Sequence, residues 1–67
     1  MVQDILEQIV STLYVQILNK NVDFVESVYF ENNGELIIFY MQQDTELMQR
    51  FNSLKDFLKK CSQECKI

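Results

Sequence analysis

Cys61 and Cys65 are the most reactive side chains in this chain, which contains no histidine. Four residues apart on a helix, both thiols would project to one side and could supply two ligands to a zinc ion shared with a second copy. They could alternatively form a redox-active disulfide, although that spacing strains the last helical turn. The third interpretation is that both thiols pack as small hydrophobic groups. We favour packing and predict no metal or cofactor.

Other catalytic patterns are missing from the sequence. The single glycine, Gly34, leaves none for a phosphate-binding loop or a nucleophile elbow. Glu26 is the one carboxylate that strand alternation places on an otherwise apolar face, where burial would raise its pKa and suit it to proton transfer. A strand end or a β-bulge would instead turn Glu26 outward, and this is the outcome we expect. We therefore predict no catalytic residue and no enzyme.

The middle of the chain predicts a β-hairpin. Two β-rich runs, 24–30 and 36–41, are separated by a loop that contains Asn33-Gly34. This dipeptide is typical of a two-residue type I′ turn, which needs positive φ at both central residues. The cross-strand pairs that follow are Phe30 with Ile37, Val28 with Phe39 and Glu26 with Met41.

Two amphipathic segments flank the hairpin. Residues 2–19 repeat apolar side chains with the period of an α-helix, and Asn19 or Asn21 can end that helix. The second predicted helix begins at Asp44 or Thr45, either of which can act as its N-cap. Its apolar stripe consists of Leu47, Phe51, Leu54, Leu58, Cys61 and Cys65.

The chain is therefore predicted to be one α+β domain, residues 1–67, with the order α-β-β-α. Both helices would pack on one face of the antiparallel hairpin. We expect that face to carry Phe24, Val28, Phe30, Ile37, Phe39 and Met41.

The segment 36–41 is apolar on both strand faces, which is typical of strands covered on both sides. A chain of 67 residues with a two-stranded ribbon has little material to cover both. Two free strand edges also invite pairing with another chain. We therefore expect a homodimer, or a different protein, to cover the second face. The expected interface residues are Tyr14, Val15, Leu18, Val25, Tyr29, Leu36, Ile38 and Tyr40.

Charge is segregated along the chain, whose net charge is −4. Acidic residues dominate up to Gln49, among them Asp4, and basic residues dominate from Arg50 onward. Lys55, Lys59 and Lys66 could share one side of a helix, but nucleic-acid-binding domains normally carry a stronger basic balance. We predict no direct binding to nucleic acid.

These features favour a small, acidic, non-enzymatic protein-interaction module or regulator. It would bind itself and another protein. The alternatives are a viral or phage-type inhibitor that imitates nucleic acid with its carboxylates, and a redox or zinc role for the cysteine pair. The longest apolar run, 36–41, is too short to span a bilayer, and no targeting signal is visible. We expect no membrane partner and a cytoplasmic location.

Overall fold

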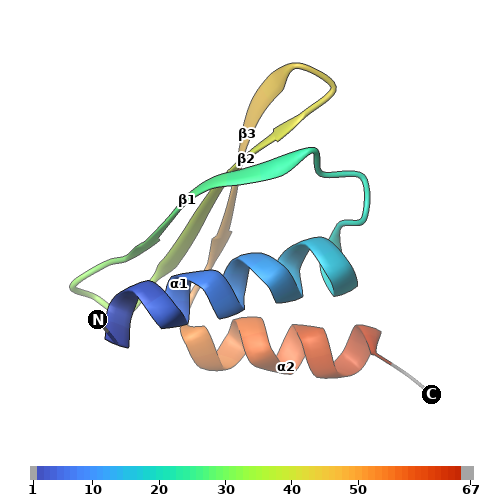
Figure 1. The fold of residues 1–67 in the computed structure, drawn as a ribbon. Helices are drawn as coiled ribbons and strands as arrows, with labels where there is room; N and C mark the ends of the chain where they lie inside the picture. The colour runs from blue at the N-terminus through green and yellow to red at the C-terminus, as the bar shows by residue number, and fades with distance from the viewer. Residues whose placement is uncertain (1, 66–67) are drawn as a thin grey trace.

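The protein folds as two helices on one side of a three-stranded antiparallel sheet (Figure 1). The computed structural model describes the backbone of residues 2–65 and the side chains of residues 5–65. The predicted α+β class and the two helices are confirmed, but the sheet contains a third strand that the sequence analysis assigned to a helix. The elements are α1 (Val2–Leu13), a π-helical turn η1 (Tyr14–Leu18), β1 (Phe24–Phe30), β2 (Leu36–Gln42), β3 (Thr45–Phe51) and α2 (Leu54–Glu64).

The first helical segment runs as predicted, although its last turn is widened. The backbone N–H of Asn19 donates to the carbonyl of Tyr14 at 2.8 Å, five residues earlier, which closes η1. The side chain of Asn19 then accepts from the backbone N–H of Asn21, so the chain turns toward the sheet. Tyr14 follows Val10 by four residues and therefore lies on the same helix face, and both side chains are buried.

The strand β3 replaces the first part of the predicted second helix, so the predicted start at Asp44 or Thr45 is wrong. Leu47 and Phe51 fit a helical period of four, but they also fit strand alternation, and short apolar runs do not distinguish the two. The helix begins only after Ser53, whose hydroxyl accepts from the backbone N–H of Asp56 at 3.1 Å. Ser-x-x-Asp is a helix-start pattern, and it marked the true boundary.

The loop between β1 and β2 has three residues and not the two that were predicted. Gly34 adopts φ +94° and its N–H donates to the carbonyl of Glu31 at 2.9 Å, while the N–H of Glu31 donates to the carbonyl of Glu35. Asn33 does not have positive φ, so the turn is not type I′. A type I turn followed by a glycine at positive φ is the usual three-residue hairpin loop.

The longer loop shifts the predicted hairpin register by one residue. The observed pairs include Phe30 with Leu36, Val28 with Ile38 and Ser27 with Phe39. A shift of one residue exchanges the two faces of a strand relative to its neighbour. Val28 and Phe30 still face the helices as predicted. Their neighbours on β2 are Ile38 and Leu36, and not the predicted Phe39 and Ile37.

The second hairpin holds the type I′ geometry. Gln43 and Asp44 have φ values of 53° and 63°, and the two residues connect Gln42 directly to its cross-strand partner Thr45. The side chain of Asp23 accepts from the N–H of Gln43 at 3.1 Å, which ties the turn to the segment before β1.

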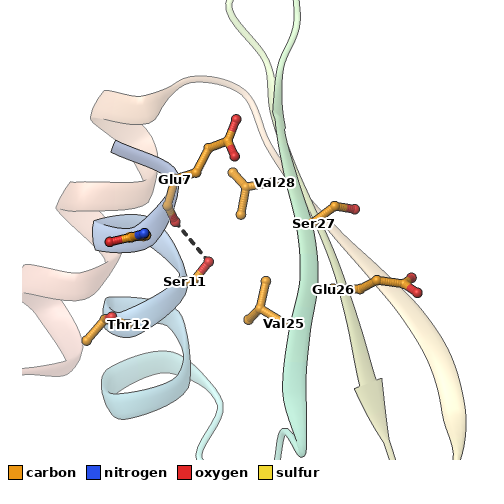
Figure 2. A pocket seen from close by; sticks show the side chains of 8 residues that line it. Glu7, Ser11, Thr12, Val25, Glu26, Ser27 and Val28 are labelled. Atoms are coloured by element: carbon orange, nitrogen blue, oxygen red, sulfur yellow. Dashed lines mark hydrogen bonds between the residues drawn. The ribbon is translucent and has the colours of Figure 1, made fainter. Parts of the chain in front are cut away.

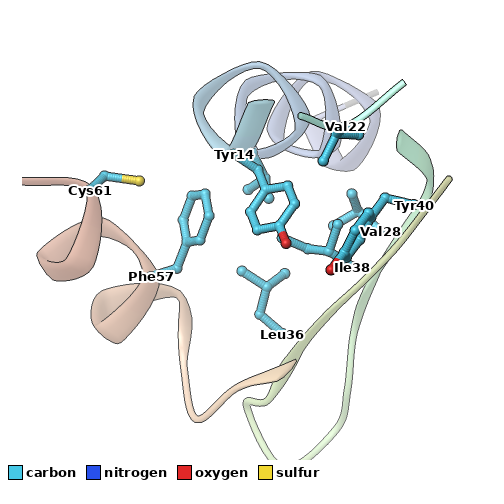
Figure 3. Close-up of a cluster of buried hydrophobic side chains, with 9 residues drawn as sticks. Tyr14, Val22, Val28, Leu36, Ile38, Tyr40, Phe57 and Cys61 are labelled. Carbon is cyan, nitrogen blue, oxygen red and sulfur yellow. The ribbon is translucent and has the colours of Figure 1, made fainter. Parts of the chain in front are cut away.

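The core lies between the sheet and the two helices (Figure 3). Leu36, Ile38 and Phe57 have no exposed surface, and the ring of Phe57 meets Phe51 edge to face with centroids 5.1 Å apart. The predicted helix-facing set on β2, Ile37, Phe39 and Met41, is therefore wrong. These three side chains point to the other face, because the register shift exchanges the two sets.

A β-bulge between Val25 and Ser27 interrupts β1. The predicted outward turn of Glu26 is confirmed, since its side chain is exposed. Because of the bulge, the residues before it face the opposite side of the sheet from the one that strand alternation predicts. Phe24, predicted to be covered, is therefore 56% exposed.

Within residues 2–65, no helix has both the length and the apolarity that a membrane crossing requires.

Candidate interaction surface

The face of the sheet opposite the helices is apolar and is not covered by any described part of the chain. Strand alternation and the observed register place six large apolar side chains on this face. Three of them, Phe24, Tyr29 and Met48, are about half exposed or more. We call this surface the open face, and it comprises Phe24, Tyr29, Ile37, Phe39, Met41 and Met48.

Aromatic side chains form the centre of the open face. The rings of Tyr29 and Phe39 meet edge to face, with centroids 5.6 Å apart and an interplanar angle of 84°. Such contacts hold each ring in one orientation, and a tyrosine offers apolar area together with a polar tip. Contiguous exposed apolar surface rimmed by polar groups is typical of a protein-binding site.

Charged side chains border the open face. Glu26, at the bulge, and Glu46, on β3, lie close enough for a hydrogen bond between their carboxyl groups. That hydrogen bond and the like charge of Glu46 raise the pKa of Glu26 above its ordinary value. Arg50 is exposed on the same face of β3, and among residues 5–65 the only ion pair within 4.0 Å joins Lys60 to Glu64. Both signs of charge are thus available to a partner.

Four of the eight predicted interface residues lie in the core of the molecule. Tyr14, Leu36, Ile38 and Tyr40 belong to the core, with exposed fractions of 8% or less, so they cannot form an interface of the folded chain. Their assignment to an interface is corrected. For the three strand residues the physical reason is the shifted register, and Tyr14 is buried because it shares the inner helix face with Val10. Val15, Leu18 and Val25 are half-buried and pack against the core. Tyr29 is the one member of that set on the open face.

A groove of about 570 Å³ separates α1 from β1 (Figure 2). Val25 and Val28 point from the strand toward the helix, whereas Glu26 and Ser27 point to the other side of the sheet. The helix contributes polar side chains, including Ser11, whose hydroxyl donates to the carbonyl of Glu7 at 2.8 Å. The hydrogen bond of Ser11 therefore runs to a main-chain carbonyl of its own helix and not to a side-chain base.

A smaller cavity of about 290 Å³ opens beside the rings of Tyr14 and Tyr40, whose centroids are 5.3 Å apart. Burial raises the pKa of Tyr14 far above its ordinary value, and its hydrogen bond with Tyr40 adds to this effect. Tyr14 therefore stays protonated and acts as a hydrogen-bonding group of the core. Lys60 and Glu64 line the cavity mouth.

The two cysteines have different surroundings. Cys61 is 5% exposed and belongs to the core, as the packing interpretation predicts, but Cys65 is exposed, so that interpretation is wrong for the second thiol. Burial raises the pKa of the Cys61 thiol, with a smaller contribution from Cys65. Neither cysteine belongs to a group of three or more potential metal ligands within the described residues.

Two of the other charged residues named in the sequence analysis have described side chains. Lys55 and Lys59 are exposed on α2. Lys66 and the side chain of Asp4 lie outside the described residues.

No protein-family model matches the chain, and no curated protein or solved structure is significantly similar to it. The candidate site is therefore defined by the geometry of this chain.

Proposed function

We propose that this protein is a non-enzymatic interaction module that binds another protein through its open face. The observation that carries the proposal is the apolar patch of the open face, in which the half-exposed Tyr29 packs edge to face on Phe39, next to the exposed carboxylates of Glu26 and Glu46. Large apolar side chains on a fixed sheet surface supply most of the affinity in protein interfaces. The bordering charges influence the association rate and its salt dependence more than the final affinity.

The open face is better suited to a protein than to a small molecule. The side chains lie along a sheet surface, and the groove beside α1 and the cavity beside Tyr14 lie elsewhere, on the helix side of the strands. Ligand sites for small molecules are concave and bury most of the ligand. An extended apolar surface instead matches a complementary surface of similar size.

The experiment compares capture of host proteins by the wild type and by two matched charge variants. Phe39→Lys places a charge at the centre of the open face, and Leu58→Lys places one at an exposed apolar site on α2. A partner retained by the wild type and by Leu58→Lys but lost by Phe39→Lys would support the proposal. Equal capture by all three proteins would contradict it, provided that circular dichroism shows each variant to be folded.

A second candidate function is an acidic decoy of nucleic acid. It is favoured by the exposed carboxylates of Glu26, Glu31, Asp44 and Glu46 along the sheet and its turns. A decoy would bind a basic surface mainly through charge, so its affinity would fall steeply with salt and it would compete with DNA. Affinity for the captured partner across a salt series, with and without DNA, distinguishes the two functions. Weak salt dependence with loss of binding in Tyr29→Lys supports the interaction module.

A further inference from the structure

The two edges of the sheet differ in how they are protected. The β1 edge is interrupted by the bulge at Glu26, and it lies beside α1 across the groove. The β3 edge pairs with β2 at every residue from Thr45 to Phe51 without a bulge, and all but the last of these residues are exposed. A long, regular and exposed edge strand is a template for pairing with another strand.

The turn geometry identifies which main-chain groups β3 presents at this edge. A two-residue turn makes Gln42 and Thr45 a hydrogen-bonded pair, so alternate residues from Thr45 bond to β2. The residues between them, Glu46, Met48 and Arg50, direct their N–H and C=O groups away from β2. The side chains of these three residues lie on the open face.

We propose that β3 pairs antiparallel with β3 of a second copy, about a two-fold axis at Met48, to form a continuous six-stranded sheet. This is the register in which all seven residues of the strand, Thr45–Phe51, find partners. It places Met48 opposite itself and sets Glu46 opposite the partner's Arg50, twice over because of the symmetry. Each of these pairs uses main-chain groups that point outward, so the hydrogen-bond ladder continues across the axis.

Charge complementarity supports this register over its neighbours. Glu46 lies against Glu26 in the single chain, and neither Glu46 nor Arg50 belongs to an ion pair among residues 5–65. The second copy brings a guanidinium to each carboxylate pair. A two-fold axis at Glu46 or at Arg50 would instead place like charges opposite each other and would leave part of the strand unpaired.

The dimer deepens the proposed function, because it joins two open faces into one surface on the same side of the extended sheet. It does not need the other protein in order to form, so the two proposals can fail separately. The dimer also replaces the predicted interface through Leu36, Ile38 and Tyr40, which the core already buries.

The test is a charge-exchange series measured by sedimentation equilibrium. Wild-type protein should have twice the mass of one chain. Glu46→Arg and Arg50→Glu each create two like-charge pairs, so each should weaken dimerisation at least about tenfold. The double variant Glu46→Arg/Arg50→Glu restores both attractive pairs and should recover most of the loss. Lys59→Glu, an exposed charge reversal on α2, is the control and should dimerise like the wild type.

Three outcomes would overturn the proposed dimer through the β3 edge. They are a wild type that stays monomeric at the highest concentration reached, single variants that dimerise normally, and a double variant no better than the singles. A normal dimer in the single variants would indicate face-to-face packing of the sheets. Capture of the partner by a monomeric Arg50→Glu variant would leave the proposed function standing while locating the interface away from the β3 edge.

Discussion

Ile37 and Ile38 are neighbours of the same chemical type, and they have opposite surroundings. Ile38 has no exposed surface, because it faces the helices, whereas Ile37 is partly exposed on the open face. The same contrast runs along β2, where both faces are apolar but only one meets Phe57 and Tyr14. The comparison shows that an apolar residue, in a strand with two apolar faces, can belong either to the core of the chain or to a surface that is open to binding.

The largest expected effect tests this contrast directly. Ile38→Ala should lower the free energy of unfolding by about 2–5 kcal/mol, because it creates a cavity in a fully packed site. Ile37→Ala should cost less than about 1.5 kcal/mol, because its site is open to solvent on one side. Urea denaturation of both variants measures the difference. Equal losses would indicate that the open face is buried in the folded protein in solution.

The next prediction concerns the loop between β1 and β2, whose length decides which face of β2 meets the helices. Gly34→Val should destabilise the fold by about 1–3 kcal/mol, because a β-branched residue must adopt positive φ. No heavy atom outside the neighbouring residues lies within 4 Å of the added Cβ, so the cost is conformational and not steric. Asp44→Gly in the other turn serves as the counterpart. It should not lower the melting temperature, since Asp44 already holds φ 63°.

Tyrosine hydroxyls offer a milder test of the two faces. Tyr40→Phe should cost about 1 kcal/mol, because it removes a polar group from a buried side chain that packs against the buried Tyr14. Tyr29→Phe removes a hydroxyl from a half-exposed side chain and should change stability by less than about 0.5 kcal/mol. Thermal denaturation of the two variants checks this order. A larger loss for Tyr29→Phe would contradict the assignment of faces.

Thiol reactivity compares the interior with the surface in the wild-type protein. Cys65 should react with a thiol reagent at mildly alkaline pH well before Cys61, which is buried and has a raised pKa, so that less of it is thiolate. Single Cys65→Ser and Cys61→Ser variants assign the fast and slow phases. Equal rates at both positions would show that α2 opens readily from the core.

The smallest expected effect concerns the acidic border of the open face. Because Glu46 raises the pKa of Glu26, the folded state binds a proton more tightly than the unfolded state. Stability from this pair is therefore present below the ordinary pKa of 4.5 and is lost as pH rises through the raised value. Glu26→Gln should flatten this step in denaturation curves measured at dilute protein concentration. Glu31→Gln, an exposed carboxylate beside the loop, is the control.

Local chemistry explains the predictions that were right. The apolar period of residues 2–19 predicted the first helix, and the β-rich runs on either side of Gly34 predicted the first hairpin. The outward position of Glu26 also followed from local reasoning, because a lone carboxylate on an apolar strand face is stabilised by a bulge that exposes it. Each of these features depends on a few neighbouring residues.

The errors arose where two local patterns competed. Leu47 and Phe51 fit both a helix and a strand. The choice depends on the pairing of β3 with β2, which joins segments that a helical period does not relate. Asn33-Gly34 permits a two-residue or a three-residue loop, and the difference of one residue exchanges the faces of β2. The Ser53 start signal was readable and would have placed the second helix correctly.

The amino-acid sequence alone determined that this chain is a small α+β domain with more apolar strand surface than its two helices can cover. Only the tertiary structure decided which surface remains uncovered. The physical reason is that strand faces alternate with every residue, so a single added loop residue moves Leu36, Ile38 and Tyr40 from the expected interface into the core. The same packing leaves Tyr29, Met48 and the β3 edge exposed, where contacts with other molecules can form.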